Sequence, residues 1–217
     1  MRSPTLEEHD IEIPLARLNL AGTLTIPADA DALVLFVHGS GSSRFSPRNR
    51  FVAALLQQAG LATLLMDILS IQEEHQDAYT GDFRFDIGLL SDRVLAATDW
   101  LHHKEIPQAR HLGLFGSSTG AAAALVAAAR RPEAVASVVS RGGRPDLASD
   151  NLRFVRAPTL LIVGGLDTVV IPLNETAAEV LTCPHELVIV PGASHLFEEP
   201  GKLEEVATLA RAWFLSH

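Results

Sequence analysis

The stretch that decides the fold runs from residue 111 to residue 130 and reads HLGLFGSSTGAAAALVAAAR. Its first part, residues 111–115, is predicted to form a strand, and its last part, residues 121–130, a helix. The five residues between them, GSSTG, leave room only for a sharp turn that lifts the central Ser118 above the sheet. Glycine is needed at both ends of this turn because side chains there would clash. A strand, a strained turn and a helix in this order predict a functional serine.

The rest of the chain repeats the alternation of strand and helix. Residues 33–37, LVLFV, are continuously apolar, as expected of a strand buried on both faces. Residues 86–103 form the clearest amphipathic helix, with apolar side chains at helical spacing. Further strands are expected at residues 61–66, 134–139, 159–163 and 187–190, and further helices from the Ser46 cap to Gly60 and at residues 203–214.

Residues 9–27 precede this alternation and switch regularly between apolar and polar side chains, which predicts one or two antiparallel strands. The fold class predicted is α/β, with a mostly parallel central sheet, helices on both faces and the antiparallel strands at the N-terminus. In such folds, ligands bind at the carboxyl ends of the strands.

Composition limits the classes of partner. The 217 residues, 47% hydrophobic and 20% charged, fit one globular domain spanning residues 1–217. The formal charge of -9 disfavours binding to nucleic acid. Cys183 is the only cysteine, so no intrachain disulfide forms. The first ten residues lack the apolar stretch of a secretory signal, and the longest apolar run, residues 121–129, is too short to span a bilayer. We therefore expect a cytoplasmic protein without a membrane partner.

Ser118 stands at the centre of G-x-S-x-G, the position of a nucleophile in this strand–turn–helix context. Ser117 is off-centre in the motif and is rejected as the nucleophile. An alternative interpretation of the whole motif is the glycine-rich turn that nucleotide-binding folds use. A serine hydroxyl needs a base at neutral pH, and the base needs an orienting acid. Three histidines follow Ser118. His195 follows the strand at 187–190, whereas His185 precedes that strand and His217 is terminal, so His195 is the predicted base.

The acid should also follow a strand. Asp167 comes directly after the strand at 159–163, behind a pair of glycines that permits a tight turn. Asp146 and Asp150 follow the preceding strand and are alternatives. A helix cap for a segment starting near Pro172 is another interpretation of Asp167.

An oxyanion hole needs two backbone donors aimed at the developing negative charge. The N–H of Thr119, directly after the serine, is one candidate. The other is the N–H of Ser40, in the glycine-containing loop after the strand at 33–37.

Four segments occur in the order seen in α/β-hydrolases: HGSGSS at 38–43, GSSTG at 116–120, GGLD at 164–167 and PGASHLFEEPG at 191–201. From Leu33 onward the chain resembles the dienelactone hydrolase-related branch of that superfamily. The resemblance implies the α/β-hydrolase fold, ester hydrolysis, and neither a metal nor an organic cofactor. Dienelactone hydrolases use a cysteine nucleophile where this chain has Ser118, so a generic carboxylic ester is the expected substrate.

Few residues are available to shape a substrate site. The connection between the strands at 134–139 and 159–163 is too short for a large lid domain, which favours a small soluble substrate. Residues 67–85, with Tyr79, form either a partial cover or a solvated loop. Arg141 and Arg144 are candidates for binding a substrate carboxylate, or are surface arginines.

The predicted function is a serine hydrolase that cleaves a small soluble ester through an acyl-enzyme intermediate. A thioesterase, acyltransferase or peptidase would use the same triad, and a receptor or scaffold with the same fold would use none of it.

Overall fold

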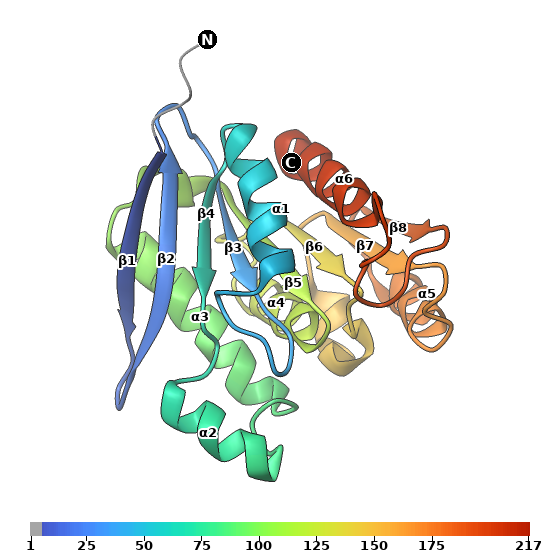
Figure 1. The fold of residues 1–217 in the computed structure, drawn as a ribbon, viewed down its shortest axis with the longest axis horizontal. Helices are drawn as coiled ribbons and strands as arrows, with labels where there is room; N and C mark the ends of the chain where they lie inside the picture. The colour runs from blue at the N-terminus through green and yellow to red at the C-terminus, as the bar shows by residue number, and fades with distance from the viewer. Residues whose placement is uncertain (1–5) are drawn as a thin grey trace.

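The computed structural model describes residues 6–217, which form one eight-stranded sheet in the order β1-β2-β4-β3-β5-β6-β7-β8 (Figure 1). The strands are β1 (Leu6–Pro14), β2 (Asn19–Pro27), β3 (Leu33–Val37), β4 (Ala62–Met66), β5 (Leu112–Ser117), β6 (Ser137–Arg141), β7 (Thr159–Gly164) and β8 (His185–Val190). The helices are α1 (Pro47–Gln58), α2 (Ile71–Thr80), α3 (Ile87–His103), α4 (Thr119–Arg130), α5 (Ile171–Val180) and α6 (Lys202–Ser216), with short 3₁₀ segments at Pro107–His111 and Pro145–Phe154.

The N-terminal residues form two antiparallel strands, as predicted. β1 pairs with β2 along its whole length, and β2 then pairs antiparallel with β4. All remaining neighbours, from β4 across to β8, are parallel. The α/β class with a mostly parallel sheet is thereby confirmed.

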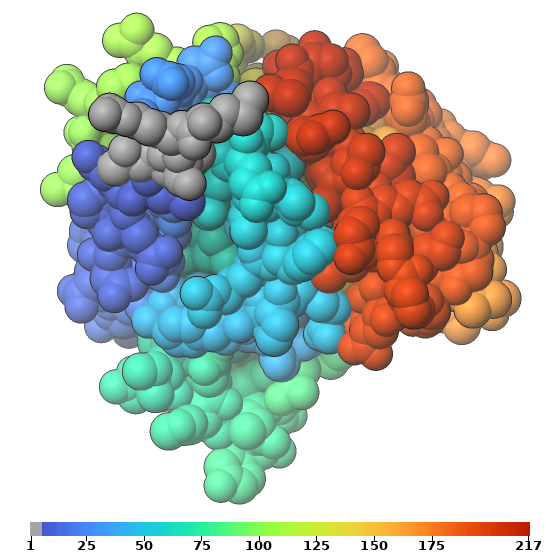
Figure 2. All heavy atoms as spheres, turned by 45° about the horizontal axis from the view of Figure 1, so that its top comes forward, coloured from blue at the N-terminus to red at the C-terminus, as the bar shows by residue number. Residues whose placement is uncertain are grey.

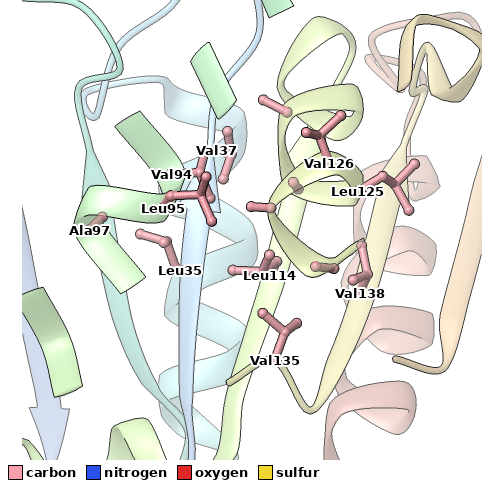
Figure 3. Packing of buried hydrophobic residues seen from close by; sticks show 14 of the residues in the cluster. Leu35, Val37, Val94, Leu95, Ala97, Leu114, Leu125, Val126, Val135 and Val138 are labelled. Atoms are coloured by element: carbon pink, nitrogen blue, oxygen red, sulfur yellow. The ribbon is translucent and has the colours of Figure 1, made fainter. Parts of the chain in front are cut away.

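Helices cover both faces of the sheet, and each face has its own core. On one face, Leu35, Leu114 and Val138 of the central strands pack against α3 and α4 (Figure 3). On the other face, Phe36 and Phe115 pack with side chains of α1 and α6. The ring centroids of Phe36 and Phe115 are 4.8 Å apart. Alternate residues of one strand therefore point into different cores, which explains the continuous apolar runs in the sequence.

The predicted bounds of several elements were off by one to three residues, and β8 begins at His185, which was expected to precede it. The strand predicted at residues 134–139 begins at Ser137 and ends at Arg141, so that Arg141 belongs to the strand. A helix, α2, lies within residues 67–85, where no helix was expected. Its sequence signal is a capping box, in which the Ser70 hydroxyl accepts from the N–H of Glu73 and the Glu73 carboxylate accepts from the N–H of Ser70.

The carboxyl ends of the parallel strands lie at one edge of the sheet, and α2 projects beyond this edge (Figures 1 and 2). We call residues 67–85 the cover segment. The 3₁₀ segment at Pro145–Phe154 fills the connection between β6 and β7, so no large lid domain lies between these strands. Within residues 6–217, no helix is long and apolar enough to cross a bilayer.

Candidate active site

Ser118 lies in a strained turn at the carboxyl end of β5. Its φ of 51° and ψ of -123° fall outside the regions that L-residues usually adopt. The glycines on each side make the turn feasible: a Cβ on Gly116 would lie 2.4 Å from the Cα of Ala121, and one on Gly120 would lie 2.3 Å from the carbonyl oxygen of Val37. The turn is therefore fixed by backbone packed against backbone. We call residues 116–120 the serine turn.

His195 and Asp167 are brought into contact by the loops that follow β8 and β7. The distance between His195 Nδ1 and Asp167 Oδ2 is 2.6 Å, and the carboxylate is almost fully buried, with 10% of its side chain exposed. The two loops approach closely because Gly164 has no side chain; a Cβ there would lie 2.4 Å from the carbonyl oxygen of Ala193. The carboxylate can hold Nδ1 protonated and leave Nε2 as the basic nitrogen.

Ser118 and His195 border the same short segment, residues 141–142. The N–H of Ser118 donates to the carbonyl of Arg141 at 3.3 Å. A Cβ on Gly142 would lie 3.5 Å from two atoms of the His195 ring. Among the hydrogen bonds within residues 6–217, none joins Ser118 Oγ to His195. Such a bond is often long in a ligand-free enzyme and shortens when substrate binds.

The alternatives weighed for the base, the acid and the nucleophile are engaged elsewhere. Asp146 accepts two hydrogen bonds from the Arg144 guanidinium, at 2.9 and 2.8 Å. Asp150 is exposed and pairs with Arg153. The hydroxyl of Ser117 donates to Asn49 on α1, and His185 begins β8 at the opposite edge of the sheet.

The candidate oxyanion donors differ in availability. Thr119 is the first residue of α4, where N–H groups have no partner within the helix. The N–H of Ser40, by contrast, donates to Thr119 Oγ1 at 3.1 Å, so in this structure it already has an acceptor. The residue after Ser118 is a threonine, and its hydroxyl lies within reach of the loop after β3.

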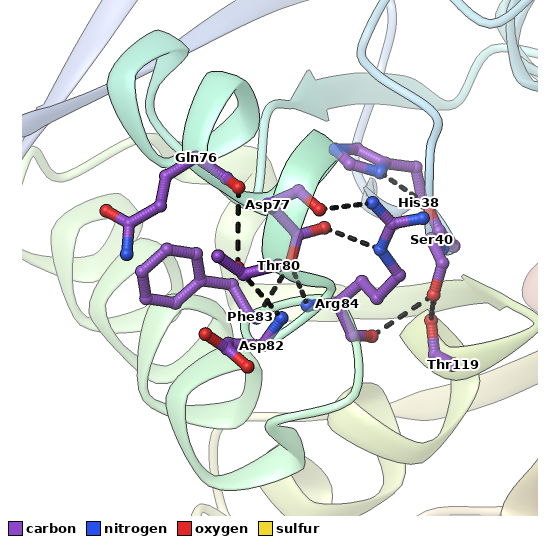
Figure 4. A network of polar contacts seen from close by, with 10 residues as sticks. His38, Ser40, Gln76, Asp77, Thr80, Asp82, Phe83, Arg84 and Thr119 are labelled. Atoms are coloured by element: carbon purple, nitrogen blue, oxygen red, sulfur yellow. Dashed lines mark hydrogen bonds and ion pairs between the residues drawn. The ribbon is translucent and has the colours of Figure 1, made fainter.

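The directions of the hydrogen bonds around Ser40 follow from counting protons. The hydroxyl of Ser40 donates to the carbonyl of Arg84 at 3.1 Å, so it accepts from the hydroxyl of Thr119 at 3.0 Å. Thr119 Oγ1 in turn accepts from the Ser40 N–H. Figure 4 shows this chain of bonds running from the cover segment to the first residue of α4.

The cover segment folds around the carboxylate of Asp77, a residue that is 4% exposed. This carboxylate accepts from the backbone N–H groups of Phe83 and Arg84 and from Arg84 Nε (Figure 4). Arg93 on α3 adds an ion pair with Glu73 on α2, at 2.6 Å. The cover segment is thus ordered by polar side chains.

A pocket of about 480 Å³ lies between the loop after β3, the start of α1 and the cover segment. Its walls include Ser40 and Thr119, and Ala78 and Glu74 of α2. Ser118 and His195 are not among the lining residues, although Thr119 directly follows Ser118. Residues of the cover segment therefore form one wall of this pocket, and whether the segment covers Ser118 stays a prediction.

His38 links the loop after β3 to the cover segment from within the core. Its Nε2 accepts from the N–H of Ile68 at 3.0 Å, so the proton resides on Nδ1, which donates to the carbonyl of Gly39 at 2.9 Å. Burial lowers the pKa of His38, and the backbone bond to Gly39 and the charge of Asp67 oppose this shift only in part. His38 is a neutral structural residue.

The structure separates the three candidates for substrate contact. Tyr79 is 93% exposed and does not line the pocket, so no observation here supports its predicted contact with substrate. Arg144 is tied to Asp146, which raises the pKa of Arg144. Arg141 is buried and lies next to the residues that border Ser118.

Among residues 6–217, no group of three or more His, Cys, Asp or Glu side chains is arranged to hold a metal ion.

Comparison with known proteins agrees with the fold. A family model described as the dienelactone hydrolase family matches residues 21–215. A crystal structure of dienelactone hydrolase from Anabaena variabilis is 57% identical, covers 98% of each chain and superimposes with a TM-score of 0.95. Est1E from Butyrivibrio proteoclasticus, at 16% identity over 95% of this chain and 98% of its own, shares the fold with a TM-score of 0.79.

Two curated relatives from strains of Mycobacterium tuberculosis are 51% identical over 214 residues. Both are provisionally named as phosphoribosyl transferases. The match covers 99% of this chain and 47% of each relative, so the chain spans about half their length.

The strained serine turn on a mostly parallel sheet, with a histidine and a carboxylate at the same edge, defines an α/β-hydrolase fold. The resemblance recognised from the motifs is confirmed. This chain belongs to the dienelactone hydrolase family.

Proposed function

We propose that this protein is a serine hydrolase that cleaves a carboxylic ester of a small soluble substrate. The observation that carries the proposal is the 2.6 Å contact between His195 and Asp167, at the sheet edge that also holds the strained Ser118. The pocket of about 480 Å³ is of the size that takes a small molecule.

In the proposed reaction, Ser118 Oγ attacks the ester carbonyl while His195 Nε2 takes its proton. Asp167 orients the imidazole and stabilises its charged form. The tetrahedral intermediate collapses, His195 gives the proton to the leaving alkoxide, and an acyl-enzyme remains. Water, deprotonated by His195, then releases the acid.

The oxyanion of the intermediate needs two donors. The N–H of Thr119 supplies one. We assign the second to the N–H of Ser40, for which the substrate oxygen would replace Thr119 Oγ1 as the acceptor. The substrate must therefore displace an internal hydrogen bond before the hole is complete.

The test uses Ser118→Ala and, as a matched control, Ser117→Ala. We expect Ser118→Ala to lower kcat for a p-nitrophenyl ester of a short acid by at least about 10³-fold. The variant should also lose labelling by a fluorophosphonate, whereas Ser117→Ala should retain both. Full activity in a folded Ser118→Ala protein would refute the assignment of Ser118 as the nucleophile.

The same assay separates the other candidate functions. A thioesterase, acyltransferase or peptidase would also be labelled by the fluorophosphonate. A thioesterase would prefer a thioester substrate, an acyltransferase an acceptor other than water, and a peptidase an amide. A receptor or scaffold would not label at Ser118. A cytoplasmic location is part of the proposal, and fractionation of the source cells tests it.

A further inference from the structure

Arg141, the last residue of β6, is a buried cation without a partner in the described part of the chain. Only 6% of the residue is exposed, and its Nε and Nη1 atoms are enclosed and make no hydrogen bond with any residue from 6 to 217. Arg144, three residues further on, is held by Asp146. Burying a charge is costly unless an opposite charge or several hydrogen bonds compensate it. The surroundings of Arg141 therefore lack an anion.

The alternation of β6 places Arg141 on the face of the sheet covered by α1 and α6. Val139, two residues earlier, packs in the core beneath these two helices. Ser117, the residue opposite Arg141 on β5, donates to Asn49 in the first turn of α1. The side chain of Arg141 thus lies on the side of the sheet where α1 begins.

The beginning of α1 adds positive charge and offers no acid. Its first turn contains Arg48 and Arg50 and no Asp or Glu, and its N-terminus is the positive end of the helix dipole. Arg48 pairs through Nη1 with Glu198, at 3.0 Å, but its Nε is enclosed and has no partner among residues 6–217.

Arg141 and Arg48 lie on the same side of the sheet, Arg141 at the end of β6 and Arg48 in the first turn of α1. Burial lowers the pKa of Arg141 to about 10, and the nearby charge of Arg48 contributes to the shift. Arg141 nevertheless remains charged at neutral pH. Two cations beside a helix N-terminus are a typical setting for a carboxylate or phosphate group.

This positive region is next to the proposed reaction centre. The carbonyl of Arg141 accepts from the N–H of Ser118, and the following residue, Gly142, borders the ring of His195. Arg48 also lines the pocket of about 480 Å³. The backbone of Arg141 thus belongs to the segment that borders both Ser118 and His195, and Arg48 reaches the neighbouring pocket.

We propose that Arg141, with Arg48 and the N-terminus of α1, forms a subsite for an anionic group, carboxylate or phosphate, carried by the substrate. The proposal rests on the proposed function for its link to catalysis, but the binding of an anion does not depend on it. It narrows the substrate class from small esters in general to esters that carry a negative charge.

Binding is tested in the Ser118→Ala variant, which cannot turn over an ester. The ¹⁵N-labelled protein is titrated with inorganic phosphate and, in a separate series, with propionate. We expect a saturable shift of the Arg141 Nε–H signal, identified by its loss in Arg141→Met, with at least one of the anions. The stronger of the two identifies the group as phosphate or carboxylate.

Charge-matched variants locate the site. Arg141→Met should lower the affinity for the anion by at least about tenfold, the loss expected for hydrogen bonds to a charged group. In this variant, binding is followed by the shift of the Gly142 amide signal. Arg130→Gln, an exposed arginine on α4 paired with Asp92, should leave the affinity within twofold. No saturable shift, or equal affinity in Arg141→Met, would overturn the proposal. If the amide spectrum shows Arg141→Met unfolded, Arg48→Gln replaces it, with a threefold loss as the threshold.

Kinetics of the wild-type protein and Arg141→Met separate this proposal from the proposed function. The substrates are p-nitrophenyl butyrate, which is neutral, and p-nitrophenyl hemisuccinate, which ends in a carboxylate. We expect Arg141→Met to lose at least about tenfold in kcat/KM for the hemisuccinate alone. If the wild type hydrolyses neither ester yet its Ser118→Ala variant binds the anions, the proposed function fails and the subsite stands. If the wild type hydrolyses the esters but its Ser118→Ala variant binds neither anion, the subsite fails and the proposed function stands.

Discussion

The serine turn and the cover segment lie close to the same pocket but are held in different ways. The serine turn is fixed by backbone atoms at van der Waals limits, with no side chain between Gly120 and the end of β3. The cover segment is held by polar contacts, chiefly the hydrogen bonds to the buried carboxylate of Asp77 and the ion pair between Glu73 and Arg93. Rigid backbone packing suits the role proposed for Ser118, because a nucleophile must be held in place. Hydrogen-bonded side chains suit a wall that can open locally, because such regions unfold at lower cost than a core.

The largest expected effect comes from adding one methyl group to each region. Gly120→Ala should lower the free energy of unfolding by about 3 kcal/mol or more, because the new Cβ meets carbonyl oxygens of Val37 and His38 that cannot move aside. Gly81→Ala, at the end of α2, should cost only about 1 kcal/mol, since its φ of 70° is disfavoured but the space is open. Urea unfolding measures both. Equal losses in the free energy of unfolding for Gly120→Ala and Gly81→Ala would show that the serine turn is not more tightly packed than the cover segment.

The next effect concerns the carboxylate in the cover segment. Asp77→Asn removes one of the oxygen acceptors and the charge that Arg84 pairs with, so we expect the segment to open about 2 kcal/mol more easily. Hydrogen–deuterium exchange should rise in peptides covering residues 67–85 and stay unchanged in α4. Asp82→Asn, an exposed neighbour, is the matched control. Faster exchange throughout the sheet would mean that the cover segment does not open independently.

A smaller effect is expected from His38, which joins the two regions. Its pKa is lowered in the folded protein, so below about pH 6.5 the unfolded chain binds a proton that the folded protein does not. The free energy of unfolding should therefore fall as the pH falls, by at most about 1.4 kcal/mol per pH unit from this residue.

His38→Gln should remove that part of the pH dependence while keeping an acceptor for Ile68. His102 is exposed on α3, so His102→Gln should leave the pH dependence unchanged. Unfolding curves between pH 5 and 8, taken as differences from the wild type, give the answer. An unchanged slope in His38→Gln would show that His38 binds the same number of protons in the folded and unfolded states over this range.

The smallest effect is expected at Tyr79. Tyr79→Ala should change kcat/KM for a neutral ester by less than about twofold, because the side chain is exposed and outside the pocket. Ala78→Phe, at the adjacent position, should raise KM because Ala78 lines the pocket. Comparable losses from both variants would mean that α2 turns its other side to the substrate.

Much of the candidate site could be predicted from local sequence. The G-x-S-x-G turn between a buried strand and an alanine-rich helix predicted the strained position of Ser118, because in this context the motif is typical of a sharp turn with an exposed serine. The glycines before Asp167 and the position of His195 after a strand were enough to predict that the two side chains lie at the same edge, and they are 2.6 Å apart. The helix α2 was missed because its sequence is polar, although its capping box was present in the sequence.

The sequence by itself determined the alternation of strands and helices, and with it the edge at which Ser118, Asp167 and His195 gather, because apolar periodicity and glycine spacing are local properties. Only the tertiary structure decided which donors and charges are available. Thr119 Oγ1 accepts from the Ser40 N–H across 79 positions of chain, and among residues 6–217 Arg141 lies unpaired while Arg144 has a partner. Such differences depend on the distance between residues far apart in the chain, which no local pattern contains.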